Sequence, residues 1–141
     1  MHGRFGALLL AVAVATALGG CAQATLDSKA VKTEAQMIAS VASEGSILST
    51  QTTRGRIKES FAQVEAADLA DEAAKSQQDL EPALATPELK STVEHLQSVA
   101  EDTSVELRAL ETDPRNLDRI AALAKRLAKL RDAASNVDDR L

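Results

Sequence analysis

Residues 86–110 have the sequence TPELKSTVEHLQSVAEDTSVELRAL, and this stretch decides the fold class. Its apolar positions step by alternate fours and threes and form one seam: Leu89, Val93, Leu96, Ala100, Thr103, Leu107 and Leu110. That spacing puts every seam residue on one helix face, with Thr103 as the only polar member. Thr86 is a preferred N-cap residue, and Pro87 suits the first helical position, where its missing N–H is harmless. We therefore predict a helix that begins at these two residues.

The segment that follows carries a second seam of the same kind. Its members are Ile120, Leu123, Leu127, Leu130, Ala134, Val137 and Leu141. Between the two seams, Asp113 is expected to cap the last helix and Pro114 to open it. Because this connection is very short, the two helices are predicted to lie antiparallel as a C-terminal hairpin.

An earlier helix is predicted from Asp27 or Ser28, either of which can cap it, to about Ser49. Its apolar stripe at helical spacing consists of Val31, Ile38, Val41 and Leu48. We expect Met37, beside this stripe, to fill a gap in the core. We expect Gly45 to mark a close contact between two helices.

The run of hydroxyl side chains at residues 49–53 suits a turn better than a helix interior. A helix is then predicted over residues 54–78, followed by a connector over residues 79–85 around Pro82. The clear stripe of this helix is Ile57, Phe61 and Val64, and Leu69 and Ala73 continue it on a shifted face. Phe61 is the only aromatic residue after the leader, and a lone aromatic on a stripe is expected in the core.

Four segments of similar length with short turns predict an all-α domain over residues 28–141, an up-down-up-down four-helix bundle. The composition agrees, because the chain lacks Trp and Tyr while Ala, Leu, Glu and Lys are abundant. One alternative stays open at this stage. If no break occurs near residues 50–55, the first two helices form one long helix, and dimerisation would be needed to bury it.

The amino terminus has the three parts of an export signal. A weakly positive start precedes an apolar stretch over residues 7–18, which is too short to span a bilayer stably. The stretch ends in Leu18-Gly19-Gly20-Cys21, and Cys21 is the only cysteine. This resembles the lipobox of bacterial lipoproteins.

The lipobox resemblance implies a signal peptide over residues 1–20 that is cut before Cys21, and a lipidated tether over residues 21–27. It further implies diacylglycerol on the Cys21 thiol and an acyl chain on its amine, which together anchor the chain to the membrane. A rival cleavage after Ala24, in Ala22-Gln23-Ala24, would instead release a soluble protein.

The lipobox resemblance also bears on location in the cell envelope. In a host with two membranes, Ala22 after the cysteine implies the periplasmic face of the outer membrane. In a host with one membrane, the implied place is the outer leaflet of the plasma membrane.

Counts of residue types exclude several chemistries. A net charge of −5 and a single aromatic after the leader argue against nucleic-acid binding. His95 is the only histidine after the leader, so di-iron and zinc sites fail on the number of ligands. Haem ligation by Met37 and His95 would lack an attachment motif. We therefore expect no enzyme activity and no cofactor beyond the lipid on Cys21.

The charges are divided between two parts of the chain. Acidic residues dominate residues 59–113, whereas the last helix is rich in basic residues: Arg115, Arg119, Lys125, Arg126, Lys129 and Arg131. We expect this helix to dock on its acidic neighbours. A sharper alternative is a basic face for anionic headgroups or an acidic polymer.

Two functions follow from these patterns. The first is a non-catalytic interaction or structural module at the envelope, which binds a protein partner or a second copy through a helical face. Val99 and Val105 are the surplus apolar residues that could supply such a face. The alternative is a binder of a small or lipid-like ligand inside the bundle, for which the chain offers few aromatic walls.

Overall fold

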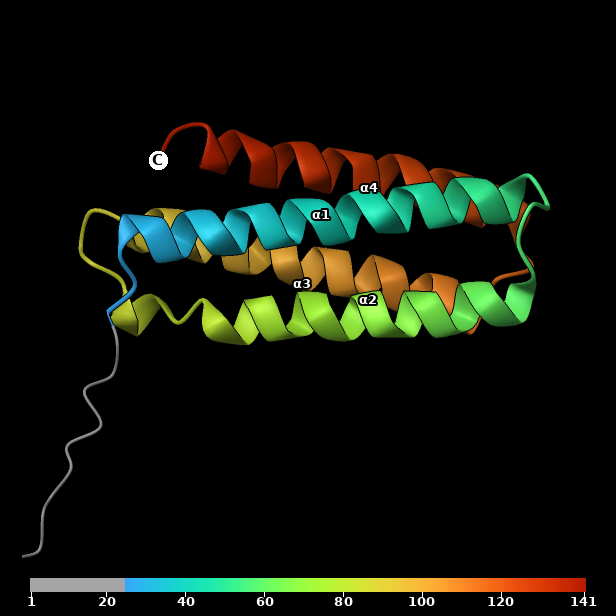
Figure 1. The fold of residues 1–141 in the computed structure, drawn as a ribbon, viewed down its shortest axis with the longest axis horizontal. Helices are drawn as coiled ribbons and strands as arrows, with labels where there is room; N and C mark the ends of the chain where they lie inside the picture. The colour runs from blue at the N-terminus through green and yellow to red at the C-terminus, as the bar shows by residue number, and fades with distance from the viewer. Residues whose placement is uncertain (1–24) are drawn as a thin grey trace, which may run out of the picture.

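The computed structural model describes residues 25–141, and this part of the chain is all-helical, as predicted. Four α-helices pack side by side (Figure 1). They are α1 (Ser28–Thr53), α2 (Glu59–Asp79), α3 (Lys90–Thr112) and α4 (Leu117–Asp138), with a short 3-10 helix η1 (Pro82–Leu84) between α2 and α3. The predicted signal peptide and Cys21 lie outside the described residues.

Helix α4 packs most extensively on α1, and α2 packs most extensively on α3. Near one end of the first pair, Lys32 Nζ donates to the carbonyl oxygen of Asp138 at 3.3 Å. Near its other end, Ser46 Oγ donates to the carbonyl oxygen of Ala124 at 2.9 Å, so α1 and α4 are antiparallel. In the same way Ser104 reaches Ala70 and Gln63 reaches Glu111, which makes α2 and α3 antiparallel.

The two predicted seams form the centre of the core. On α3 every seam residue within the helix is buried, and Leu89, just before it, is half-buried. On α4 the seam is buried at Ile120, Leu123, Leu127, Ala134 and Val137 and half-buried at Leu130. The prediction is wrong only for Leu141, which lies beyond the end of α4 and is exposed.

The break between the first two helices exists, but it comes later than predicted. Residues 49–53 are helical, and Ser49 and Thr52 are buried. Four hydroxyls of this run donate to the carbonyl four residues earlier at 2.8–2.9 Å, which satisfies them without a turn. The chain turns instead at Gly55, whose φ of +64° favours glycine. The helices are therefore separate, and α2 begins at Glu59 rather than Arg54.

Of the three helix caps predicted from the sequence, one is confirmed. Asp27 caps α1, since its Oδ1 accepts from the Ala30 N–H at 2.8 Å. The start predicted at Thr86 is wrong, because a turn closed by the Leu89 N–H on the Thr86 carbonyl precedes α3. The cap predicted at Asp113 is also wrong, because Asn116 caps α4 by accepting from the Arg119 N–H at 3.1 Å.

The connector between α2 and α3 holds the start of the described chain. The Leu26 N–H donates to the Leu84 carbonyl at 2.8 Å, and Leu26 forms an isolated parallel bridge with Ala85. Leu80, at the beginning of the connector, is fully buried. Residues 25–27, the described part of the predicted tether, therefore lie at the end of the helices where the α2–α3 connector is (Figure 1), and we call this end the tether end.

Candidate functional site

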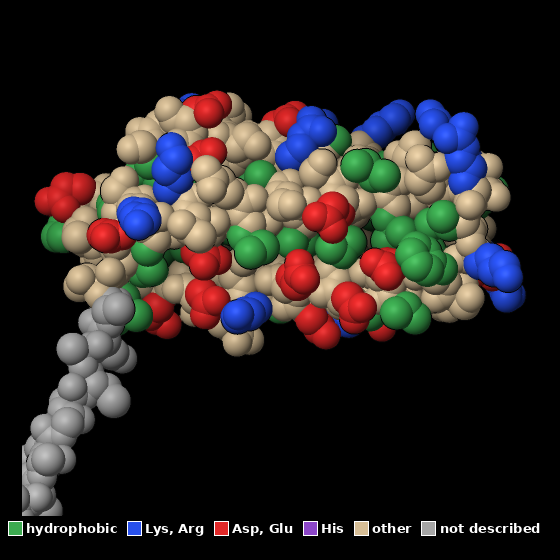
Figure 2. All heavy atoms as spheres, in the orientation of Figure 1, with side chains coloured by type: hydrophobic (Ala, Val, Ile, Leu, Met, Phe, Trp, Pro, Cys, Tyr) green, Lys and Arg blue, Asp and Glu red, His purple; other side chains and the backbone are tan. Residues whose placement is uncertain are grey.

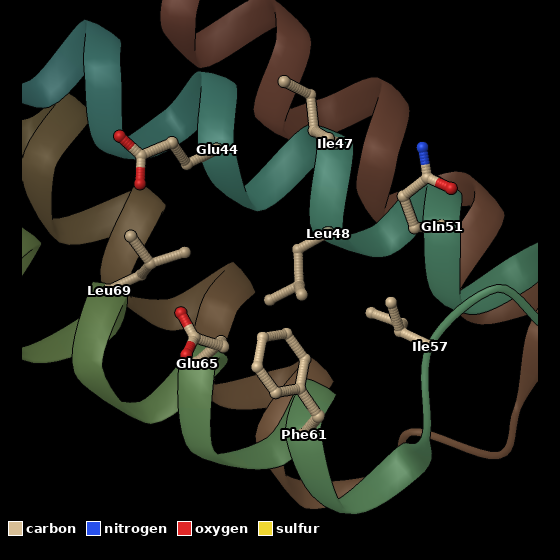
Figure 3. Close-up of a pocket in the computed structure, with 8 residues that line it drawn as sticks. All are labelled: Glu44, Ile47, Leu48, Gln51, Ile57, Phe61, Glu65 and Leu69. Atoms are coloured by element: carbon tan, nitrogen blue, oxygen red, sulfur yellow. The ribbon is translucent and has the colours of Figure 1, made fainter.

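The space between α1 and α2 is an open groove of about 270 Å³, close to the loop that joins the two helices (Figure 3). We call it the α1/α2 groove, and eight residues line it: Glu44, Ile47, Leu48, Gln51, Ile57, Phe61, Glu65 and Leu69. Phe61 points from α2 toward Leu48 of α1, with Ile57 of the loop beside them. The carboxylate of Glu44, from α1, lies on the same side of the groove as Glu65 and Leu69 of α2.

Large apolar side chains of the groove are open to solvent. Phe61 is 51% exposed and Ile47 is 58% exposed. The expectation that Phe61 lies in the core is therefore wrong, and Val64 of the same predicted stripe is also exposed.

The buried face of α2 agrees with the prediction only at Leu69 and Ala73. It consists of small residues and one leucine: Ala62, Ala66, Leu69, Ala70, Ala73 and Ser76. A methyl side chain lets two helices approach closely, so the alanine face can lie against α3. The bulkier Phe61 and Val64 stay at the edge.

A second hollow of about 230 Å³ continues the seam between α1 and α2 toward the tether end. Its lining is Glu34, Met37, Glu72, Lys75, Ser76 and Asp79. Met37 is exposed here, so the expectation that it fills a gap in the core is wrong. Figure 2 shows apolar side chains gathered between α1 and α2 and acidic side chains beside them.

Ion pairs join the other helices to one another. Lys32 pairs with Asp138 across α1 and α4 at 3.2 Å, and Arg108 of α3 pairs with Asp71 of α2. Arg126 of α4 binds Glu106 of α3 through two hydrogen bonds at 2.6 and 2.8 Å. These bonds raise the pKa of the Arg126 guanidinium above its ordinary value. Among residues 25–141, no ion pair joins α1 to α2.

The expected docking of the basic last helix on acidic neighbours is met only in part, because within residues 25–141 Arg126 is the one basic residue of α4 that pairs with another helix. Arg115 binds Glu59 at 2.7 Å, which ties the segment before α4 to the start of α2. Arg119 and Arg131 pair with acidic residues close to them in sequence. The bonds between Arg126 and Glu106 complete this set.

Gly45 marks a close helix contact, as expected. A Cβ at this position would lie 2.6 Å from Leu107 Cδ2 and 3.1 Å from Leu127 Cδ1. The absence of a side chain therefore lets α1 meet side chains of α3 and α4 at this level of the core.

The remaining predicted residues are not brought together into a site. His95 is exposed and lines a hollow with Glu88 and Arg140, whereas Met37 lines a different hollow. In the described part of the chain, no group of three or more His, Cys, Asp or Glu residues is placed to hold a metal ion. Of the two surplus valines, Val99 is buried and Val105 is 61% exposed. The lipobox residues Leu18, Gly19, Gly20 and Cys21 lie outside residues 25–141.

The sequence contains one indication of the groove, a repeat of acidic residues, which an analysis of the apolar residues alone misses. Glu65, Glu72 and Asp79 repeat every seven residues along α2, so they share one face of the helix. Each of them lines one of the two hollows between α1 and α2. The side of α2 that carries these carboxylates and Phe61 therefore faces solvent.

Within residues 25–141, none of the helices has the length and hydropathy that crossing a bilayer requires. Comparison of the chain with protein-family models, characterised proteins and solved structures found no match.

Proposed function

We propose that this protein is an envelope-anchored lipoprotein whose helical domain is a non-catalytic interaction module. The single observation that carries the proposal is the α1/α2 groove, where Ile47 and Phe61 are about half-exposed. Exposed apolar side chains gathered in one place and edged by polar residues are typical of protein-binding surfaces. The domain would bind a protein partner through this groove.

For the architecture, we propose an up-down-up-down bundle with α3 and α4 as an antiparallel hairpin. The support comes from the short connections and from the two antiparallel pairs, α1 with α4 and α2 with α3. The pair Arg126–Glu106 adds a contact between α3 and α4. In such a bundle α1 and α2 are neighbours, and the groove is the seam between them.

For the anchor, the proposal rests on Leu18-Gly19-Gly20-Cys21, the lipobox-like sequence. Lipid on Cys21 would hold the domain by a short tether at the end where Leu26 meets the α2–α3 connector. The groove centre at Ile47 lies about 28 Å along α1 from its start, at 1.5 Å per residue. A partner in the groove would therefore be held away from the anchoring membrane.

The alternative function, a small-ligand binder within the bundle, has less support. The centre of the described helices is filled, since a Cβ on Gly45 would already collide with Leu107. The groove of about 270 Å³ is slightly smaller than typical small-molecule pockets, which range from roughly 300 to 1,000 Å³. It is also open along one side, which suits a protein segment better than an enclosed ligand.

Crosslinking in the native host tests the interaction module. The photoreactive residue p-benzoylphenylalanine replaces Phe61 in the groove or, as a matched control, Val105, which is similarly exposed on α3. We expect one discrete protein adduct at position 61 and none at position 105. The adduct should disappear when Ile47→Glu places a charge in the groove.

Mass spectrometry of the mature amino terminus tests the anchor. We expect acyl chains on Cys21 and loss of membrane attachment in the Cys21→Ser variant. A free Thr25 terminus would refute the anchor.

The crosslinking experiment has two contrary outcomes. Equal adducts at positions 61 and 105 would refute the groove as the interaction site, and a bound small molecule in place of a protein adduct would favour the alternative.

A further inference from the structure

We infer that the groove takes an amphipathic helix with a leucine-type stripe and lysine or arginine on both flanks. This inference rests on the proposed function, because it names the partner chemistry of the same groove. The apolar stripe and the basic flanks of this partner are both inferred from the residues that line the space between α1 and α2.

The apolar stripe is required by the floor of the groove. Leu48 and Leu69 form its base, and Ile47, Ile57 and Phe61 stand around them. An extended strand would satisfy few of its backbone groups here, because both walls are helices whose backbone hydrogen bonds are already made. A helix carries its own backbone hydrogen bonds and presents side chains at i, i+3, i+4 and i+7.

The basic flanks are required by the charges on the two walls. Glu44 of α1 and Glu65 of α2 line the groove itself. Glu34 of α1 and Glu72 and Asp79 of α2 line the second hollow, which continues the same seam between the two helices. Lys75 is the only basic residue among the lining residues of the two hollows. None of these five carboxylates has an ion-pair partner in the described part of the chain. A helix with cations on both flanks would neutralise both walls at once.

A second copy of this chain does not fit the groove. Two copies meeting face to face would bring the same five carboxylates against one another. The basic helix α4 cannot serve as the occupant, because its apolar face, including Leu123 and Leu127, is fully buried in its own core. An anionic lipid surface is disfavoured too, because the carboxylates would repel its headgroups.

The loop at the end of the groove gives the bound helix a direction. Arg54, Arg56 and Lys58 are exposed there, and none of them has an ion-pair partner within residues 25–141. The carboxyl end of a helix carries partial negative charge. The bound helix should therefore place its C-terminus beside this loop and its N-terminus toward the tether end.

Three synthetic helical peptides test the inference. The first has a leucine stripe flanked by lysines, the second has the same stripe flanked by glutamates, and the third has the lysines with an alanine stripe. Each is titrated into the isotope-labelled full chain in zwitterionic nanodiscs, with empty nanodiscs as the blank. We expect the first peptide to bind at least about tenfold tighter than either of the others, which corresponds to about 1.4 kcal/mol. NMR shift changes should centre on Glu44, Ile47 and Phe61.

A charge swap makes the test independent of the peptide design. The double variant Glu44→Lys/Glu65→Lys should lose the lysine-flanked peptide and prefer the glutamate-flanked one. The matched control Glu94→Lys/Glu101→Lys makes the same charge change on exposed positions of α3 and should leave the preference unchanged. Neither pair of residues takes part in an ion pair, so both variants should fold. A spin label on the peptide C-terminus should broaden the signals of residues 54–58.

Several results would overturn the inference. They are equal binding of the lysine-flanked and glutamate-flanked peptides, no binding of the first peptide, or shift changes around Val105 instead of the groove. A groove crosslink from the photoreactive residue at position 61, together with any of these, would leave the interaction module standing and reject only the basic helix as its partner. Loss of that crosslink would instead reject the module itself.

Discussion

Helix α1 packs against α4 on one side and against α2 on another, and the two contacts differ. Toward α4, Gly45 allows a close approach to Leu127, and hydrogen bonds from Lys32 and Ser46 tie the two helices together near both ends. Toward α2, large apolar side chains stay exposed and carboxylates line both walls. We call the tightly packed side of α1 toward α4 the sealed side, and the partly exposed side toward α2 the open side. Both sides belong to one helix, so they differ through the size and charge of the side chains they carry.

The largest expected effect comes from breaking the sealed side with Leu127→Ala. Leu127 is fully buried and lies next to Gly45. The change removes buried apolar atoms and leaves a cavity, so we expect the free energy of unfolding to fall by about 2–5 kcal/mol. Urea denaturation followed by circular dichroism measures this loss. A cost near zero would mean that the α1/α4 side is not tightly packed.

A smaller loss is expected when Gly45→Ala adds a methyl group where α1 meets side chains of both α3 and α4. The new Cβ would lie 2.6 Å from a methyl of Leu107, which is itself fully buried and has little room to move. We expect a destabilisation of about 1–3 kcal/mol. Helix propensity alone predicts the opposite sign, a gain of about 1 kcal/mol. A thermal or urea melt that shows stabilisation would therefore contradict close packing at Gly45.

On the open side, Phe61→Ala should cost less than about 1 kcal/mol, whereas a buried phenylalanine costs about 3–5 kcal/mol. The reason is that half of the Phe61 side chain already faces solvent. Equilibrium denaturation gives the stability, and the peptide titration gives the binding. We expect a nearly unchanged unfolding midpoint and weakened binding of the lysine-flanked peptide. A loss as large as that of Leu127→Ala would make Phe61 a core residue after all.

The smallest expected effects on the free energy of unfolding come from changes of charge. They should have opposite signs at the α3/α4 contact and at the α1/α2 contact. Arg126→Gln breaks the bidentate pair with Glu106 and should cost about 0.2–1 kcal/mol at low salt. Glu65→Gln removes one of several carboxylates that line the α1/α2 seam, and it should stabilise the fold by a few tenths of a kcal/mol at most, ~0.2–0.5. Both effects should shrink as salt is added. Two losses of equal size would show that the acidic walls do not repel each other.

The seams on α3 and α4 could be predicted because their apolar residues keep one spacing over several turns, and a helix of that pattern has one face to bury. For α2 the same reasoning was misled, because the apolar spacing is not kept along the helix and the predicted stripe shifts between Val64 and Leu69. Phe61 with Val64 is more hydrophobic, yet the face with Ala62, Ala66 and Ala70 is the buried one. Hydrophobicity alone ranks the bulkier residues first. The space left beside α3 favours the smaller ones, and this space is not a property of α2.

The sequence by itself determined the all-helical class and the two seams, and it narrowed the first cap to Asp27 or Ser28, because each of these depends on residues near one another in the chain. It also marked Gly45 as a close contact, but the partners Leu107 and Leu127 come from distant helices. The tertiary structure alone decided that α4 packs chiefly on α1, and that α1 continues through residues 49–53 to the turn at Gly55. It also decided which face of α2 is open. These features depend on which helices meet and how closely, and packing between distant segments sets both.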